Sequence, residues 1–548
     1  MRGALYLWIT TFLGVGSLAT AVDPPVQEYL RESNICKPPA GSQPENIPPV
    51  EGILLPLNHS DTKSKKFCNR FWVKDQFYKA GGPVFIYHAG ESDGEDSFES
   101  IGSRKDAEDY QLTFFEMLLK NFNGMGILME HRYYGKSIPE GVNIQDRRDA
   151  DFKWHTTDLA LEDVHRFAWS FSRKKYSRLT PNNTPWISIG GSYSGVMAAL
   201  LRQRYAETIS AAYASSAPIQ AAIEMPGYYE QIWYGMNATH PACAADLSAA
   251  IQAIDKKLKD PKQDPKERRK LKESLLGCWS EEISNALFAD WMASMFKEFQ
   301  YYGVSHNLQI LCEHIEIDPA NSKKSGPEGW AVKRGVSYVI GRLQDGSALK
   351  DAAGNFGNCT RTSDGQQVFR IQAPRSDDIS WTWQRCNEWG YFHVANVGKH
   401  QIVLSDKNVT SQQEFCTKYF INSTSKSLMR SQPDAGGTNR KYGGWNIRPS
   451  RVFWTAGQFD PWTALTPFSA DAKAIIRKKP PVCNQDTSPK GTVFGYQLNG
   501  AEHCFDFIRS AGDTRSRDTN TTIALFTDAL KIWLTCKKPT PPYDTFEL

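Results

Sequence analysis

The residues with the clearest chemical potential surround one serine. Ser192 lies in Gly190-Gly191-Ser192-Tyr193-Ser194, after a short apolar run and before an alanine- and leucine-rich run. This pattern predicts a nucleophile elbow, a tight turn between a buried strand and a helix from which the serine hydroxyl projects at the edge of a sheet. Ser194 replaces the last glycine of the usual G-x-S-x-G pattern. A glycine-rich turn without chemistry would look much the same, so the rest of the chain must decide.

A serine hydroxyl is a weak nucleophile and needs a base, usually a histidine that a carboxylate orients. Asp460 follows a strand-like segment at 451–455, and His503 follows the next one at 492–498. The order Ser, Asp, His is that of the α/β-hydrolase arrangement. We therefore predict Ser192, Asp460 and His503 as the catalytic residues.

Two further carboxylates, Glu502 and Asp506, are rivals of Asp460. Both lie too close to His503 in sequence to orient it from a separate loop. An Asp-Pro turn and a structural histidine are the alternative interpretation of these two segments.

The elements that would position these residues alternate between strands and helices. Apolar runs predict buried strands at 82–87, 126–130 and 209–218, and apolar spacing of three and four predicts a helix at 157–171. Such alternation predicts a parallel sheet covered on both faces.

The oxyanion hole needs backbone N–H groups near the serine. Tyr193 follows the nucleophile at the start of the predicted helix, and the loop His88-Ala89-Gly90-Glu91 follows an early strand, as in the α/β-hydrolase arrangement. We expect Tyr193 and Gly90 to supply these groups, although 88–91 could also be an ordinary glycine loop.

The sequence pattern changes between 221 and 436, where long amphipathic and charged stretches replace the strand-like runs. Residues Leu247, Ile251, Ile254 and Leu258 share one helical face. This block also holds six cysteines: Cys243, Cys278, Cys312, Cys359, Cys386 and Cys416. We expect a largely helical cap, inserted into the core and stapled by disulfides, with most bridges joining cysteines of the block to one another.

These observations divide the chain into five parts. They are a signal peptide (1–21), an extended or propeptide-like lead-in (22–50), the first part of the core (51–220), the cap (221–436) and the second part of the core (437–548). The fold class is therefore α/β, an α/β-hydrolase core with a mainly parallel sheet and an inserted helical cap.

The N-terminus has the pattern of a secretory signal peptide. Arg2 provides the positive charge, an apolar stretch follows it, and Ala19-Thr20-Ala21 forms the cleavage site. The 11 cysteines suit an oxidising compartment and leave at least one free thiol. Seven glycosylation sequons agree with a secreted or vacuolar/lysosomal protein, at Asn58, Asn182, Asn237, Asn358, Asn408, Asn422 and Asn520.

The composition excludes several other classes. A net charge of +4 is small for 548 residues and gives no support to nucleic-acid binding. After the signal no apolar run is long enough to span a membrane. Neither C-x-x-C nor H-E-x-x-H occurs, so we expect no metal and no cofactor.

Several motifs together resemble the S28 serine peptidases, a family that includes lysosomal Pro-X carboxypeptidase, dipeptidyl peptidase II and fungal prolyl endopeptidases. They are Gly81-Gly82-Pro83, the segments 130–137, 190–195 and 458–462, and the glycine-preceded His503. The form of 190–195 resembles the fungal members. Where the family commonly has Gly-Asn-Glu-Gly, this chain has Gly90-Glu91-Ser92-Asp93-Gly94.

The resemblance implies a hydrolase core with a helical cap, cleavage of peptides or proteins after proline, and activity at acid pH. A proline side chain needs a flat apolar slot, for which Trp462, Tyr193 and Val196 are candidates. Endopeptidase, carboxypeptidase and dipeptidyl peptidase action stay open, as does a homodimer. The alternatives are a catalytically silent binding or adhesion protein and an esterase or lipase on the same fold.

Overall fold

The computed structural model describes residues 35–38, 48–101, 113–278, 283–354, 356–363, 367–423, 427–480, 483, 491–508 and 516–536. The predicted signal peptide and most of the lead-in lie outside these residues. A ten-stranded sheet forms the base of the molecule. Its strands are, in spatial order, β1 (Ile35–Cys36), β2 (Glu51–Pro56), β3 (Lys66–Lys74), β5 (Met125–Met129), β4 (Val84–His88), β6 (Trp186–Gly191), β7 (Ile209–Ser215), β12 (Val452–Gly457), β14 (Thr492–Leu498) and β13 (Ile475–Arg477).

The sheet is parallel from β5 to β13, and β1, β2 and β3 form an antiparallel edge. Its central strands β5 and β6 are buried along their whole length because both faces of the sheet are covered. Successive residues point to opposite faces, so Trp186 packs in one apolar cluster with α3 and α4, while Ile187 packs in a second with α2 and α18.

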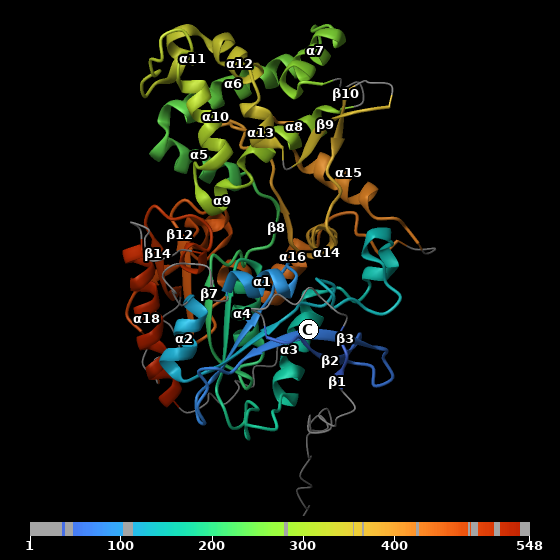
Figure 1. Ribbon diagram of the computed structural model, residues 1–548, viewed down its shortest axis with the longest axis vertical. Coiled ribbons are helices and arrows are strands. Elements are labelled where there is room, and N and C mark those ends of the chain that lie inside the picture. The colour runs from blue at the N-terminus through green and yellow to red at the C-terminus, as the bar shows by residue number, and fades with distance from the viewer. Residues whose placement is uncertain are drawn as a thin grey trace, which may run out of the picture.

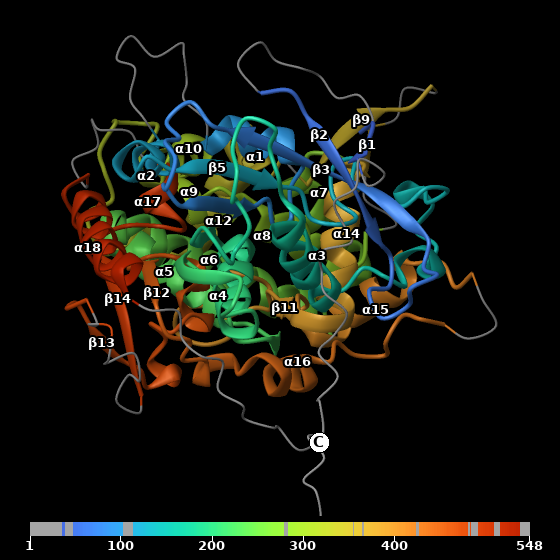
Figure 2. The same cartoon turned by 90° about the horizontal axis from the view of Figure 1, so that it is seen from below.

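Helices cover both faces of this sheet, and Figure 2 shows α18 and α2 together at one flank, away from α3. The helices of this part of the chain are α1 (Gly94–Ile101), α2 (Phe114–Phe122), α3 (Thr157–Ser170), α4 (Tyr193–Arg204), α16 (Ala435–Tyr442), α17 (Phe505–Ile508) and α18 (Ser516–Thr535). None of the described helices is long and apolar enough to cross a membrane.

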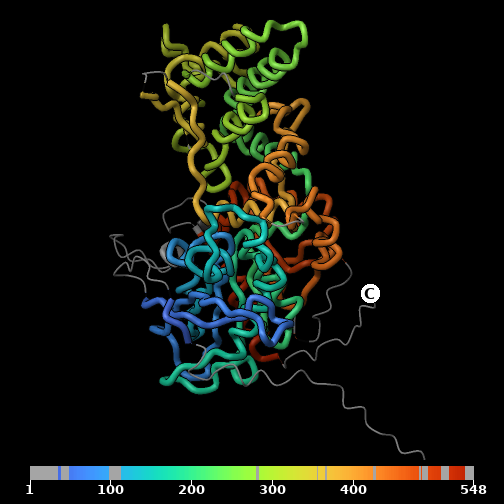
Figure 3. The backbone as a smooth tube through the Cα atoms, turned by 90° about the vertical axis from the view of Figure 1, so that its right-hand side faces the viewer, coloured from blue at the N-terminus to red at the C-terminus, as the bar shows by residue number. Residues whose placement is uncertain are grey.

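The block between β7 and α16 forms a second, largely helical lobe above the sheet (Figures 1 and 3). It contains α5 (Gly227–Thr239), α6 (Pro241–Lys259), α7 (Pro265–Leu276), α8 (Asn285–Ala293), α9 (Phe299–Tyr302), α10 (His306–Glu316), α11 (Gly329–Arg334), α12 (Val336–Gln344), α13 (Ala348–Ala353), α14 (Ser376–Gln384), α15 (Val409–Tyr419) and the strands β8 (Ala222–Glu224), β9 (Gly357–Arg361), β10 (Gln367–Ile371) and β11 (Gly390–Phe392). The expected fold, a mainly parallel α/β-hydrolase core with an inserted helical cap, is confirmed.

Five disulfides link the chain, and three of them lie within the cap. The pairs are Cys36–Cys68, Cys243–Cys312, Cys278–Cys359, Cys386–Cys416 and Cys483–Cys536. The six cysteines of the cap pair only with one another, as the sequence predicted, and the thiol left over is the buried Cys504.

One segment of the cap packs closely on the core. A π-helical turn, Arg385–Trp389, follows α14, and such turns occur often at functional sites. Gln384 of α14 donates a hydrogen bond to the Tyr193 hydroxyl (2.7 Å), and Glu388 accepts one from the Thr157 hydroxyl (2.8 Å). The cap is therefore fastened to the first turns of α3 and α4, and the domain boundaries at 221 and 436 stay predictions.

A buried ion network fixes the loop after β4. The Arg70 guanidinium contacts Glu130, Glu95 and Asp93 at 2.6–2.7 Å. Asp377 of the cap accepts hydrogen bonds from the N–H groups of Asp93 and Gly135, both at 2.9 Å. The motif around Glu130 thus supports the loop that carries Glu91.

We expect acid to destabilise the fold through buried histidines. Burial lowers the pKa of His88 to about 4 and that of His155 to about 3, whereas an unfolded chain has a histidine pKa of about 6.5. Between these values the unfolded chain binds more protons, so stability falls as the pH drops below about 6.5, by roughly 3–5 kcal/mol for each histidine at the lower limit.

Urea unfolding at about pH 7 and about pH 4.5 measures this loss. His155→Phe, which cannot titrate, should lose less stability between the two pH values than the unsubstituted protein. An equal loss in both proteins would contradict the assignment.

Candidate active site

Ser192 occupies a strained turn at the carboxyl end of β6. Its backbone angles, φ 57° and ψ −133°, are rare for a residue other than glycine, and it forms the N-cap of α4. Two glycines make the turn possible, because a Cβ on Gly190 would lie 2.1 Å from the Ser194 carbonyl oxygen and one on Gly195 would lie 2.8 Å from that of Ser215. The predicted elbow is therefore present, and Ser192 is half-buried at a cavity.

Ser194 has a side chain where the usual elbow has a glycine, and Gly90 of the neighbouring loop leaves room for it. Ser194 is buried, and a Cβ on Gly90 would lie 2.4 Å from its Oγ. The departure from the usual elbow pattern is thus compensated by a glycine on the neighbouring loop.

Asp460 and His503 meet at the carboxyl ends of β12 and β14. Asp460 Oδ1 accepts hydrogen bonds from His503 Nδ1 (2.9 Å) and from the Trp462 N–H (2.8 Å). Both side chains are buried, and His503 and Ser192 line the same cavity. The structure brings the three predicted residues to one edge of the sheet.

The charge on Asp460 controls the basicity of His503. Burial opposes protonation of the imidazole, but the Asp460 carboxylate outweighs burial, and the pKa of His503 is raised well above 6.5. Asp506 has another role: its carboxylate accepts hydrogen bonds from Tyr213, Ser215 (2.5 Å) and Thr455 (2.7 Å), which fixes the helix after His503 to the sheet.

One of the two N–H groups predicted for the oxyanion hole, that of Gly90, already has a partner within the protein. The Gly90 N–H donates to Nδ1 of His88 (3.2 Å), so it is used within the protein. The next N–H of this loop belongs to Glu91, whose side chain lines the cavity beside Ser192. Burial raises the pKa of Glu91, and a hydrogen bond from its own backbone N–H, the His503 charge and a hydrogen bond from Ser192 only partly offset this rise, so the Glu91 N–H is also used within the protein.

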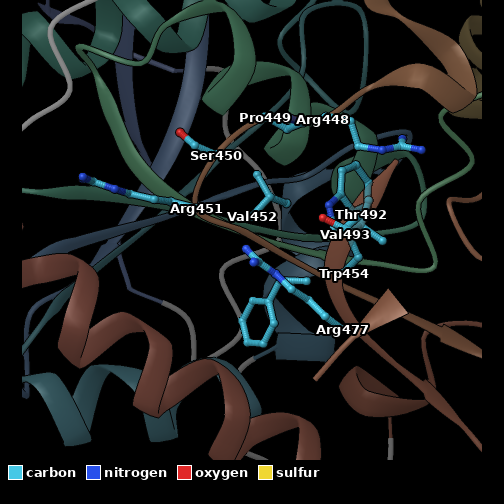
Figure 4. A pocket seen from close by; sticks show the side chains of 10 residues that line it. Arg448, Pro449, Ser450, Arg451, Val452, Trp454, Arg477, Thr492 and Val493 are labelled. Atoms are coloured by element: carbon cyan, nitrogen blue, oxygen red, sulfur yellow. The ribbon is translucent and has the colours of Figure 1, made fainter. Parts of the chain in front are cut away.

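A cavity of about 510 Å³ lies between the sheet edge and the cap. Both parts line it: Ser192, Glu91, Trp462 and His503 from the core, and Tyr228, Gln300, Tyr301, Trp381 and Arg385 among others from the cap. A second, small cavity of about 10 Å³ lies at the opposite ends of β12 and β14, lined by Arg448, Arg451 and Arg477 among others (Figure 4). The large cavity has room for several residues of a peptide.

Only one of the three predicted pocket residues lines the large cavity. Trp462 does so, with its ring 6.2 Å from that of His503. Val196 is fully buried in the core behind the elbow. The Tyr193 ring is also turned away from the cavity, because its hydroxyl bonds to Gln384 and Thr157. These two residues therefore support the elbow rather than a pocket.

Gln300 is a residue of the site that the sequence did not indicate. Its carbonyl accepts a hydrogen bond from the His503 N–H (2.7 Å), and its side-chain oxygen accepts from Trp462 Nε1 (3.0 Å) and from the Tyr228 hydroxyl (3.1 Å). Gln300 lies in the cap, about 200 residues from His503, and no local pattern marks it. Among the described residues no cluster of three or more His, Cys, Asp or Glu side chains could hold a metal ion.

The predicted glycosylation sites lie at the surface. Asn182, Asn237, Asn358, Asn408, Asn422 and Asn520 are exposed, and Asn58 is half-buried. The Asn408 side chain also caps α15 through the Ser411 N–H (3.0 Å). Their modification stays a prediction.

Comparison with known proteins gives a consistent assignment. A family model described as serine carboxypeptidase S28 matches residues 57–517. The thymus-specific serine protease of Homo sapiens is 26% identical over 436 residues, which cover 76% of this chain and 76% of that protein. A protein of Arthroderma benhamiae, whose name describes an extracellular serine carboxypeptidase, is 25% identical over 455 residues, which cover 76% of this chain and 59% of that protein.

Among solved structures, proline iminopeptidase from Mycobacterium smegmatis matches with a TM-score of 0.32 and 11% identity. The match covers 87% of this chain and 99% of that one.

We expect the efficiency of hydrolysis to rise with pH up to neutral or weakly alkaline values. His503 must be neutral to accept a proton, and its pKa is raised above 6.5 by Asp460. In Asp460→Asn the inflection should move to lower pH, and turnover should fall by about 10⁴-fold because the imidazole loses its orienting partner. The pH profile of kcat/KM for a peptide without titrating groups measures both effects. An inflection below pH 6 in the unsubstituted enzyme would contradict this prediction and support acid action.

Proposed function

This chain belongs to the serine carboxypeptidase S28 family, and from that premise we propose that it hydrolyses peptide bonds on the carboxyl side of proline. Its family makes it a serine peptidase, so its substrates are peptides. The observation that carries the proposal is the contact between Asp460 and His503 at a cavity that also holds Ser192 on a strained elbow.

In the proposed mechanism Ser192 attacks the carbonyl carbon of the scissile bond while His503 accepts its proton. Asp460 orients the imidazole and stabilises its positive charge. The Tyr193 N–H binds the oxyanion. His503 then gives the proton to the leaving amine, and water hydrolyses the acyl-enzyme by the same steps in reverse.

The preference for proline is assigned to the aromatic side chains beside His503. Trp462 lies perpendicular to the rings of Tyr228 and Tyr391, with ring centres 5.7 Å and 5.3 Å away. Flat apolar walls suit a rigid pyrrolidine ring without an N–H. The indole N–H is already bonded to Gln300, so the ring orientation is fixed before substrate arrives.

We also propose that the protein follows the secretory route. The predicted signal, the exposed sequons and five disulfides support this proposal, as does the name of the Arthroderma benhamiae relative. Secretion and delivery to a vacuole or lysosome share these features.

Ser192→Ala should abolish both peptide hydrolysis and labelling by a fluorophosphonate probe. The serine hydroxyl makes no contact that the core needs, so secretion and thermal unfolding should change little. Ser194→Ala is the matched control, because Ser194 is two residues away and buried. Retained labelling in Ser192→Ala would exclude this residue as the nucleophile and favour another hydrolase site or a binding protein.

Trp462→Ala should lower kcat/KM for peptides with proline before the scissile bond by about 10–100-fold. Peptides with alanine at that position should be affected much less, because they use less of the apolar wall. Steady-state kinetics on matched proline and alanine peptides measure the difference. Equal losses on both peptides, with a lower unfolding temperature, would show that Trp462 has only a structural role.

A further inference from the structure

Arg385 is a half-buried cation whose hydrogen-bonding capacity is mostly unused. It begins the π-helical turn after α14 and lines the large cavity. Its Nη2 donates to the Tyr391 carbonyl (3.1 Å), but its buried Nε has no partner. Among the described residues no carboxylate forms an ion pair with this guanidinium. Burial lowers the pKa of Arg385, so keeping the charge here is costly.

The acidic side chain that attracts Arg385 is already paired with another cation. Asp290 attracts Arg385 electrostatically, but its carboxylate forms an ion pair with Lys407 and accepts a hydrogen bond from Gln412 (3.3 Å). Arg385 therefore retains donors, in a fork that matches a carboxylate, and no carboxylate in the part of the chain that the structure describes pairs with them.

His393 adds a second unused polar atom to the same wall. Its ring stacks on Tyr228 with 3.8 Å between ring centres, and its buried Nε2 has no hydrogen-bond partner. Burial and the charges of Arg385 and Lys407 lower its pKa well below 6.5, so the ring is neutral and its Nε2 can carry a proton to donate.

Arg385 and His393 line the same cavity as the proposed catalytic residues Ser192 and His503. The His393 ring is 5.0 Å from that of Trp462, which is 6.2 Å from the His503 ring. The cavity is continuous from Ser192 to Arg385. A peptide attacked by Ser192 can therefore extend along the same cavity towards Arg385.

We propose that Arg385, assisted by His393, is a specificity-determining residue that binds a carboxylate of the peptide substrate. The carboxylate is either the free C-terminus or an acidic side chain next to the scissile bond. The inference rests on the proposed peptidase function and deepens it, because it gives the cavity a fixed anionic subsite.

Two pairs of peptides distinguish the sources of the carboxylate. In the first pair, an N-acetylated proline peptide ends in a free acid or in an amide. In the second pair, both ends are blocked and glutamate or glutamine flanks the scissile bond. The enzyme should prefer the acidic member of one pair, and Arg385→Met should lower kcat/KM for that member by about 10–100-fold. The neutral member should change by no more than about 3-fold, which also shows that the variant is folded.

Arg448→Met is the matched control. Arg448 also has a buried Nε without a partner and a pKa lowered by burial, but it lies at the small cavity of about 10 Å³ (Figure 4). Its loss should affect stability and leave the preference for the acidic peptide unchanged. Arg385→Lys, which keeps the charge without the fork, should retain part of that preference.

An unchanged preference in Arg385→Met would overturn the inference, as would equal rates for both members of both pairs in the unsubstituted enzyme. The second result needs no variant and holds even if Arg385→Met does not fold. Hydrolysis and Ser192-dependent labelling would persist in either case, so this failure differs from failure of the proposed function, in which both are absent.

Discussion

The strained backbone at Ser192 is the constraint on which the site depends. Its φ of 57° costs on the order of 1–3 kcal/mol and persists only where the surroundings enforce it. Here the Ser192 N–H bonds to the Ser215 carbonyl (2.9 Å), and Gly190 and Gly195 let the two strands and the helix approach closely. Ser192 is thus placed by the packing of β6, β7 and α4.

The position of His503 depends on the cap as well as on the core. His503 is held by Asp460 through its ring and by the Gln300 carbonyl through its N–H. Gln300 also fixes Trp462, so one cap residue aligns the base and the aromatic wall together. A displacement of α9 would move both, so the cap would take part in the proposed site rather than only cover it.

Three buried histidines differ in pKa because only one of them, His503, has a carboxylate partner. His88 and His155 have no acidic hydrogen-bond partner among the described residues, and burial lowers the pKa of each. His503 is equally buried, yet the Asp460 charge raises its pKa. Arg385 is the opposite case, because it is a cation with no ion-pair partner among the described residues and desolvation lowers its pKa, which is the basis of the carboxylate subsite proposed for it.

The sequence by itself determined the elements and the order of the chemical groups. Apolar runs located the central strands and flanking helices to within a few residues, and the cysteine grouping predicted the bridges of the cap, because these are local patterns of burial. Asp460 and His503 could be found because each follows a strand, and parallel strands end at one edge. Only the tertiary structure decided which atoms face the cavity. It turned Val196 and the Tyr193 ring into the core and used the Gly90 N–H internally. It also brought Gln300 of the cap to His503 and Arg385 of the cap to the cavity. Side-chain direction and long-range contacts leave no periodic signal in a sequence.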